Sequence, residues 1–323
     1  MKKLLLITLV ISLVACSSEN DLDSTISNST IKVKSFKSNP TPEDYLNMQY
    51  PKYMESVAFF KAEKSSSTKK IDAVWVNTYV PDLNFRTKLI SIGAGREDAV
   101  IGDQYIDIDR NLQILDVSNS GISDVTGLTG FKSLAQLKIN NNNLTKLAVS
   151  RMQTLRLLEC QNNKIEFLNL GSLYLLEQLW CQNNMIDSIF FPENSTNLWG
   201  VWCYNNRLTS LELHTNTGVT DLFIQENKLT SLNTTQVINL KQINVSNNNW
   251  VTLNFNSNNT LISLWCTNNV LLSDLYIKSP NANNIINQDF TQNKYGLKVH
   301  VHENFLANAI SIWPNYGNSI YVL

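Results

Sequence analysis

The chain has 323 residues, enough to bury a sizeable core, and a formal net charge of −1. The lack of a basic excess argues against nucleic acid as a main partner, and three histidines leave few candidates for acid–base or metal chemistry. Only 16% of the residues are charged, while 44 asparagines supply polarity beside 42 leucines. This joint excess of leucine and asparagine favours an architecture of internal repeats.

The first residues predict a targeting signal over 1–15. A short basic start precedes an apolar run from Leu4 to Val14. As a helix this run would rise about 16 Å, too short for a membrane core of about 30 Å, so a secretory signal peptide is expected. The sequence Leu13-Val14-Ala15-Cys16 resembles the cleavage box of bacterial lipoproteins. The resemblance implies that Cys16 carries lipid and anchors the mature chain to the membrane; an ordinary signal peptide with a chance cysteine is the alternative.

Residues 16–70 are expected to form a tether. The part up to residue 42 is rich in Ser, Asn, Lys and Thr and poor in large apolar groups, which is typical of flexible segments. Residues 43–62 could hold a short helix, broken by Pro51. The serine that follows Cys16 resembles the sorting pattern of outer-membrane lipoproteins. It implies a bacterial outer-membrane lipoprotein exposed at the cell surface.

Residues 71–111 are expected to cap the N-terminal end of the repeats, because a bare end would expose core and an open strand edge. Pro81-Asp82 and Gly93 bracket apolar residues at helical spacing, which predicts a helix with a start and a stop. The same region holds three closely spaced aspartates. They are either a calcium site or solvated residues of the cap: Asp103, Asp107 and Asp109.

Residues 112–279 carry the pattern L-x-x-L-x-L-x-x-N-x-L-x-x-L eight times, with steps of 21 or 22 residues and other apolar residues at some Leu positions. The pattern is that of the leucine-rich repeat. It predicts a solenoid shaped as a curved horseshoe of about eight repeats, with parallel strands on its concave face. A second apolar pair closes most repeats and indicates a second strand-like face. The first position of the pattern falls at Leu112, Leu134, Leu155, Leu176, Leu198, Val219, Leu240 and Leu261.

Asparagine recurs three residues after the strand in seven of these repeats. The turn there is buried, and its backbone donors and acceptors need partners. The asparagine amide both donates and accepts, so a structural role is expected for this column rather than a catalytic one. Its members are Asn142, Asn163, Asn184, Asn206, Asn227, Asn248 and Asn269.

Four cysteines share the third apolar position of the repeat: Cys160, Cys181, Cys203 and Cys266. Side chains in one column point in parallel rather than at each other. Small buried hydrophobic residues are therefore the favoured interpretation. A disulfide and a metal site are the alternatives.

Position five of the repeat lies between two buried strand positions, so its side chain is expected to point out of the concave face. Along the array this position is Asp116, Lys138, Glu159, Trp180, Trp202, Phe223, Asn244 and Trp265. An exposed aromatic row costs solubility unless something covers it, and aromatics dominate binding surfaces. The partner-binding residues predicted are Trp180, Trp202, Phe223 and Trp265, with Trp199 and Tyr204 beside them. Mutual stacking of the rings and a glycan platform are the alternatives.

Residues 280–323 no longer fit the repeat and are expected to form a mixed C-terminal cap. Lys298 to Val301 alternates like a strand, and Glu303 to Ile312 favours a helix. His300 and His302 alternate on that strand, where they could face a metal, but one pair without a further histidine is a weak signal.

Val80-Pro81-Asp82-Leu83-Asn84-Phe85, the segment from Ile122 to Leu128 and the repeats that follow resemble internalin-like bacterial surface proteins, over about residues 75–323. The resemblance implies a surface solenoid that binds another macromolecule, as in adhesion or host interaction. No catalytic set, phosphate loop or zinc spacing appears, so a binding protein is expected rather than an enzyme, without cofactor or metal. A protein or peptide partner is favoured; glycan binding and a structural role in the cell envelope are the alternatives.

Overall fold

The computed structural model describes residues 72–97, 104–285, 287–313 and 319–323, all of which belong to one compact unit. The predicted signal peptide, Cys16, the tether and Asp103 lie outside the described residues. No described helix is both long and apolar enough to cross a membrane.

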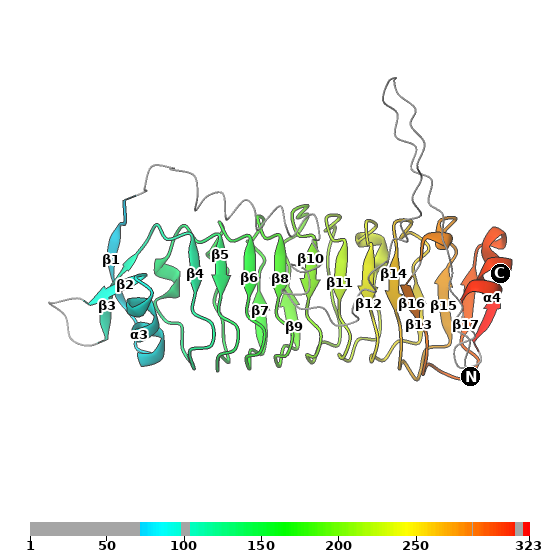
Figure 1. Cartoon of the computed structure of the whole chain (residues 1–323), viewed down its shortest axis with the longest axis horizontal. Helices are drawn as coiled ribbons and strands as arrows, with labels where there is room; N and C mark the ends of the chain where they lie inside the picture. Colours follow the sequence, from blue (N-terminus) through cyan, green and yellow to red (C-terminus); the bar gives the residue numbers. More distant parts are fainter. Residues whose placement is uncertain (1–71, 98–103, 286, 314–318) are drawn as a thin grey trace, which may run out of the picture. The chain divides into compact units, whose positions relative to one another are not determined.

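Nine parallel strands form the main sheet, and they follow one another in chain order (Figure 1). Neighbouring strands pair in register, so that Trp180 lies opposite Trp202 and Trp202 opposite Phe223. The sheet has one strand more than the eight repeats expected, because β16 falls within the residues assigned to the C-terminal cap. The strands are β4 (Ile114–Asp116), β5 (Gln136–Lys138), β6 (Leu157–Glu159), β8 (Gln178–Trp180), β10 (Gly200–Trp202), β11 (Asp221–Phe223), β12 (Gln242–Asn244), β14 (Ser263–Trp265) and β16 (Asn287–Asp289).

A second, interrupted layer of strands closes the turns, as the second apolar pair of the repeat predicted. β7 (Phe167–Asn169) pairs with β9 (Ser188–Phe190). Further along, β13 (Thr252–Asn254), β15 (Asp274–Ile277), β17 (Lys298–Val301) and β18 (Ile320–Val322) form a four-stranded parallel sheet. Short 3-10 turns complete this side: η1 (Leu128–Gly130), η2 (Thr234–Gln236) and η3 (Ala282–Asn284).

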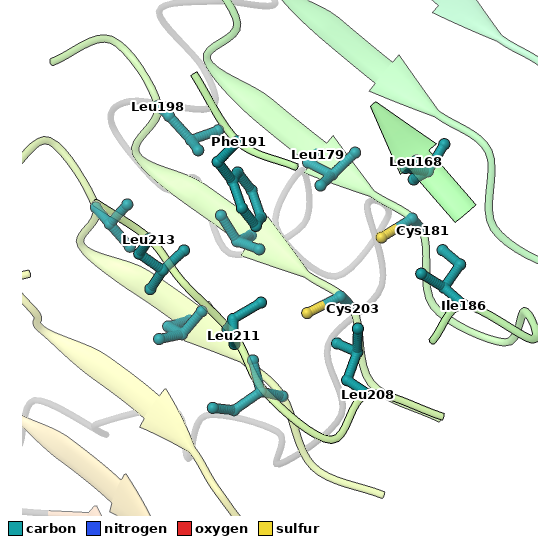
Figure 2. Close-up of a cluster of buried hydrophobic side chains, with 14 of the residues drawn as sticks. Leu168, Leu179, Cys181, Ile186, Phe191, Leu198, Cys203, Leu208, Leu211 and Leu213 are labelled. Carbon is teal, nitrogen blue, oxygen red and sulfur yellow. The ribbon is translucent and has the colours of Figure 1, made fainter. Parts of the chain in front are cut away.

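The hydrophobic core lies between the two layers. Figure 2 shows side chains of the main sheet, such as Leu179 and Cys181, gathered with Leu168 of the second layer. All three are fully buried. Each buried leucine contributes about 2 kcal/mol of hydrophobic stabilisation, so the regular spacing of leucine in the sequence fixes the stacking of the turns.

The asparagine column binds each turn to the one before it. Asn163 Nδ2 donates to the carbonyl oxygens of Ile139 and Cys160, both at 3.1 Å. Its Oδ1 accepts from the backbone N–H of Leu144 at 3.0 Å. Equivalent contacts recur at Asn142, Asn184, Asn206, Asn227 and Asn248, and Asn293 adds a further member. These contacts satisfy buried backbone groups, which is the structural role expected.

A second asparagine column, one residue earlier in the chain, lies at the surface. Asn141, Asn162, Asn183 and Asn205 all have φ between 51° and 58°. Asparagine tolerates this left-handed conformation better than most residues. Their side chains also form a chain of hydrogen bonds from one turn to the next, of 2.6 to 2.9 Å. The doubled asparagines of the sequence therefore serve two different purposes.

The N-terminal end carries the predicted helix, α3 (Leu83–Ser91), and also a three-stranded antiparallel sheet that the sequence did not predict. Its strands are β1 (Trp75–Tyr79), β2 (Gly95–Glu97) and β3 (Tyr105–Asp109). Asp82 caps α3 by accepting from the backbone N–H of Phe85, and it also accepts from Ser123 and Asp124. Burial tends to raise the pKa of Asp82, but these hydrogen bonds outweigh burial and lower that pKa. One carboxylate thus links the helix to the first repeat.

The C-terminal end agrees with its sequence pattern. β17 covers residues 298–301, as the alternation predicted. The expected helix is present as η4 (Glu303–Phe305) followed by α4 (Leu306–Ile312). Trp313 is buried, and its ring meets the ring of Phe305 edge-on, with centroids 4.8 Å apart.

The four described cysteines are buried and free, as the favoured interpretation expected. Their burial raises the pKa of every thiol, to about 12 for Cys203 and for Cys266. A thiol of this kind stays neutral and packs as a small hydrophobic group.

Candidate binding face

The main sheet has two faces of different composition. From β4 to β14 the middle residue of each strand, such as Leu179 or Val201, belongs to the hydrophobic core. The first and third residues point to the opposite side, because successive side chains of a strand alternate. We call that side the outer face. It is the face that the sequence pattern assigned to the concave side of the solenoid.

The aromatic column on this face consists of Trp180, Trp202, Phe223 and Trp265. None of the four belongs to the core cluster, which agrees with the predicted direction of their side chains. Their predicted exposure is wrong: the first three are 0% exposed and Trp265 is 9% exposed. Trp199 and Tyr204 are also buried, at 5% and 8% exposure.

The rings of the column pack on one another, which was the alternative considered from the sequence. Trp180 and Trp202 stack with centroids 3.6 Å apart and ring planes 5° apart. Phe223 lies 6.3 Å from Trp202 and 6.0 Å from Trp265, and Trp199 meets Trp202 edge-on at 5.8 Å. Such pairs contribute about 0.5 to 1.5 kcal/mol each beyond the area that they bury. Stacking on adjacent strands therefore accounts for part of the burial.

The absence of a side chain at Gly200 leaves room for the indole of Trp202. A Cβ atom added at Gly200 would lie 2.3 Å from Cη2 and 2.4 Å from Cζ3 of Trp202. The indole therefore lies back along its own strand, over the position where other strands carry a side chain. The sequence signal for this packing was the lone glycine two residues before a tryptophan, and sequence reasoning missed it.

Two glutamines extend the outer face beside the aromatic column. Gln161 and Gln182 occupy the same position in adjacent repeats and are 6% and 3% exposed. The Oε1 atom of each is buried and has no hydrogen-bond partner among the described residues. A buried amide oxygen without a donor costs free energy, so these two atoms mark a place where a donor is wanted. Neither glutamine stands out in the sequence, because both lie beyond the repeating apolar positions.

Charged residues lie toward the β4 end of the main sheet. Lys138 Nζ lies 3.0 Å from Glu159 Oε1, and Arg156 Nη1 lies 2.7 Å from Glu177 Oε1. Asp116 is exposed and accepts from the hydroxyl of Ser118. The sequence predicted a polar segment here from Asp116, Lys138 and Glu159, and the charged residues lie where it was expected. At the other end, a polar hollow of about 120 Å³ is lined by Asn244, Trp265 and Asp289, among others.

The remaining candidate residues from the sequence have structural partners. His300 Nε2 lies 2.9 Å from Asp274 Oδ1, and its ring stacks on Tyr276. His302 instead caps η4 by accepting from Asn304 N. Asp107 forms an ion pair with Arg96, and Asp109 accepts from backbone N–H groups. Within the described parts of the chain, no group of three or more His, Cys, Asp or Glu could hold a metal ion.

Solved structures with this architecture exist. The chain is similar to the internalin inlF of Listeria monocytogenes, with 17% identity and a TM-score of 0.52, over 69% of this chain and 71% of that chain. The fold is that of a leucine-rich repeat protein. The leucine-rich repeat chain is also similar to a repeat protein of Leptospira interrogans, with 21% identity and a TM-score of 0.48, over 66% of this chain and 55% of that chain. No protein-family model and no curated protein sequence matches.

Proposed function

We propose that this leucine-rich repeat protein is a surface-anchored bacterial lipoprotein that binds a protein or peptide partner through the outer face of its main sheet. The observation that carries the proposal is the concentration of aromatic side chains on that face, outside the hydrophobic core. Aromatic residues are the usual anchors of protein interfaces, and here they stand on a rigid sheet. An adhesin or host-interaction role follows from the surface location.

The polar groups of the outer face support a peptide-like partner. The two unpartnered oxygens, Gln161 Oε1 and Gln182 Oε1, require donors. Backbone N–H groups or lysine side chains of a partner would supply them.

The experiment is capture with the soluble chain that starts after Cys16, followed by measurement of Kd for each candidate. Host proteins and a glycan array are tested in parallel. Trp265→Ala and Gln182→Leu are expected to weaken binding of the partner at least tenfold, a typical hot-spot effect of about 1.4 kcal/mol or more. Phe190→Ala is the matched control, because Phe190 is 57% exposed on the second layer. Equal Kd values for all three variants would contradict the proposal.

A glycan ligand is the second candidate, and one observation favours it. The polar hollow of about 120 Å³ places Trp265 beside Asn244 and Asp289, a combination that suits a sugar ring. Binding on the glycan array that Trp265→Ala abolishes, with no protein partner captured, would favour this candidate. Retained cell adhesion after deletion of the protein would instead favour a structural envelope role.

Lipid anchoring at Cys16 is supported by the sequence alone. Cells fed a clickable fatty acid are expected to label the wild-type protein and not Cys16→Ser. Cys203→Val, which keeps Cys16, is the control and should remain labelled. Protease treatment of intact cells then tests surface exposure, since a protein on the inner side of the membrane would be protected.

A further inference from the structure

A pocket of about 340 Å³ opens on the second layer, at the edge of the two-stranded sheet formed by β7 and β9 (Figure 1). It lies between residues 145–150 of one repeat and β7 of the next. Lys146 and Ala148 line its first side, and Phe167 lines its second side. All three are exposed, whereas Leu168 of β7 belongs to the core. The pocket therefore opens on the side of the second layer that faces away from the core.

The pocket lies where the backbone ladder of the second layer is interrupted. Glu166 N donates to Thr145 O at 3.3 Å, as Asp187 N donates to Glu166 O one turn later. The segment 146–149 therefore starts in register with β7. Beyond that bond, no backbone hydrogen bond joins 146–149 to β7 within the described chain. The two segments separate there, and the pocket is the space between them.

Phe190 projects from the same side of the second layer, one strand further along. It lies opposite Asn169 in the β7–β9 pair and is 57% exposed. The next residue, Phe191, is fully buried, so alternation along the strand directs Phe190 away from the core. Phe167 on the adjacent strand is 49% exposed. Two exposed aromatic rings beside an open pocket are typical of an interaction surface.

The positions of the pocket and Phe190 are self-complementary. The pocket borders one side of β7, and Phe190 stands on the other side, on β9. A twofold axis through β7, perpendicular to the layer, therefore brings Phe190 of each copy over the pocket of the other. The rotation reverses the strand direction, so Phe190, which is level with Asn169, falls at the level of Phe167. A cavity of about 150 Å³ holds benzene, so the pocket has room for a phenylalanine ring.

We propose that this side of the second layer is the interface of a homodimer, in which Phe190 of each copy fills the pocket of the other. The exposed rings of Phe167 would meet near the twofold axis. Because the contact is isologous, each favourable interaction forms twice. A second copy fits this surface because the same chain carries both the projecting ring and the pocket that receives it.

The charges on this surface are also complementary under the same rotation. Lys146 lies at the rim of the pocket. Glu212 lies near Phe190: the ring of Phe190 meets the ring of His214 edge-on at 6.4 Å, and Glu212 Oε1 accepts from His214 N at 3.3 Å. When Phe190 enters the pocket of the other copy, Glu212 approaches the lysine at that pocket's rim. Opposite charges at both ends of the contact fix the orientation of the two copies.

This inference is independent of the proposed binding function. The dimer would use the second layer and leave the outer face of the main sheet uninvolved in both copies. The intrinsic Kd of a partner for the outer face does not depend on dimerisation, and the dimer can be measured without any partner.

The test is sedimentation equilibrium of the soluble chain that starts after Cys16, which keeps every described residue. The wild type is expected to be a dimer that dissociates on dilution. Phe190→Asp is expected to raise the dimer Kd about tenfold or more, because a charge would enter the pocket. Ile310→Asp on α4 is the matched control: Ile310 is 63% exposed, and the dimer Kd should not change. A wild type that stays monomeric throughout the micromolar range, or a dimer that Phe190→Asp leaves unchanged, would overturn the proposal.

Two further variants test the arrangement without relying on Phe190→Asp. Ala148→Trp fills the pocket from its own chain and is expected to weaken the dimer, while circular dichroism confirms that the fold is kept. Lys146→Glu should also weaken the dimer, and the double variant Lys146→Glu/Glu212→Lys should restore it. A double variant as weak as Lys146→Glu alone would overturn this orientation of the two copies.

Discussion

On the core side of the main sheet one kind of residue recurs at each position, whereas the outer face changes its chemistry from strand to strand. Leu, Val or Ile fills the middle position from β4 to β14. The third position on the outer face runs instead from Asp116 through Trp202 to Asn244. Both sides are buried in the middle of the sheet. The repeated side holds the turns together, and the variable side is free to acquire specificity.

The amide side chains on the two faces also differ in their hydrogen-bond partners. Asn206 on the core side donates to three carbonyl oxygens and accepts from the backbone N–H of Ile186. Gln182 on the outer face has a buried Oε1 with no partner. Amides of similar burial thus serve stability in one place and are available for recognition in the other. Five predictions follow, in order of decreasing effect on stability.

Asn206→Ala should destabilise the protein by about 3 to 5 kcal/mol, because it removes four hydrogen bonds and leaves buried backbone groups without partners. Urea unfolding followed by circular dichroism measures the change. Asn205→Gly is the neighbouring control and should cost less than about 1 kcal/mol, since glycine adopts the left-handed conformation of Asn205 freely. Similar losses for the two variants would contradict the structural role of the buried column.

Gly200→Ala should cost about 2 kcal/mol and change the near-ultraviolet circular dichroism, because the new methyl group forces the indole of Trp202 off its strand. Gly171→Ala is the control: its Cβ would lie 3.2 Å from the exposed ring of Phe190, which can move aside. An unchanged tryptophan spectrum in Gly200→Ala would mean that the indole does not lie where the structure places it.

Cys203→Ser should cost about 1 to 3 kcal/mol by burying a hydroxyl, whereas Cys203→Val should cost less than about 1.5 kcal/mol. Ile224 and Val245 already occupy the same position in the next repeats. Thermal unfolding compares the two, and equal melting temperatures would contradict an apolar site.

The same thiol has a pH dependence with a defined sign. Burial raises the pKa of Cys203 to about 12 in the folded protein. The unfolded chain loses this proton near the ordinary thiol value of about 8.5. The contribution to stability is therefore complete below that value and declines as the pH rises toward 12. Cys203→Val should lose less stability than the wild type between about pH 8 and about pH 10.

Gln182→Leu should change the free energy of unfolding by less than about 0.5 kcal/mol, or raise it slightly, because it removes a buried acceptor that has no donor. The comparison with Asn206→Ala is direct, since both replace a buried amide by an apolar group. A loss of several kcal/mol would show that Gln182 Oε1 is satisfied in solution and would remove one support of the proposed binding function.

The solenoid could be predicted from the repeat pattern alone. The 21- or 22-residue spacing, the leucine positions and the asparagine column specify a turn that cannot bury its apolar side alone, so stacking follows from the repeat. The cysteines, the start and end of α3 and the strand at 298–301 were also predictable, because each depends on local pattern or on its place in the repeat. The ninth strand was missed because its strand residues, Asn287 to Asp289, lack the apolar pattern.

The construction of the outer face could not be predicted in this way. Alternation along a strand gives the direction of the Trp180 and Trp202 side chains but not what covers them. Their stacking depends on contacts between residues about twenty positions apart, and on the absence of a side chain at Gly200. The unpartnered oxygens of Gln161 and Gln182 likewise appear only once neighbouring turns are stacked. A repeat pattern specifies the scaffold, because every turn buries the same apolar positions against its neighbours. The packing of the non-repeating face depends instead on the particular neighbours of each residue.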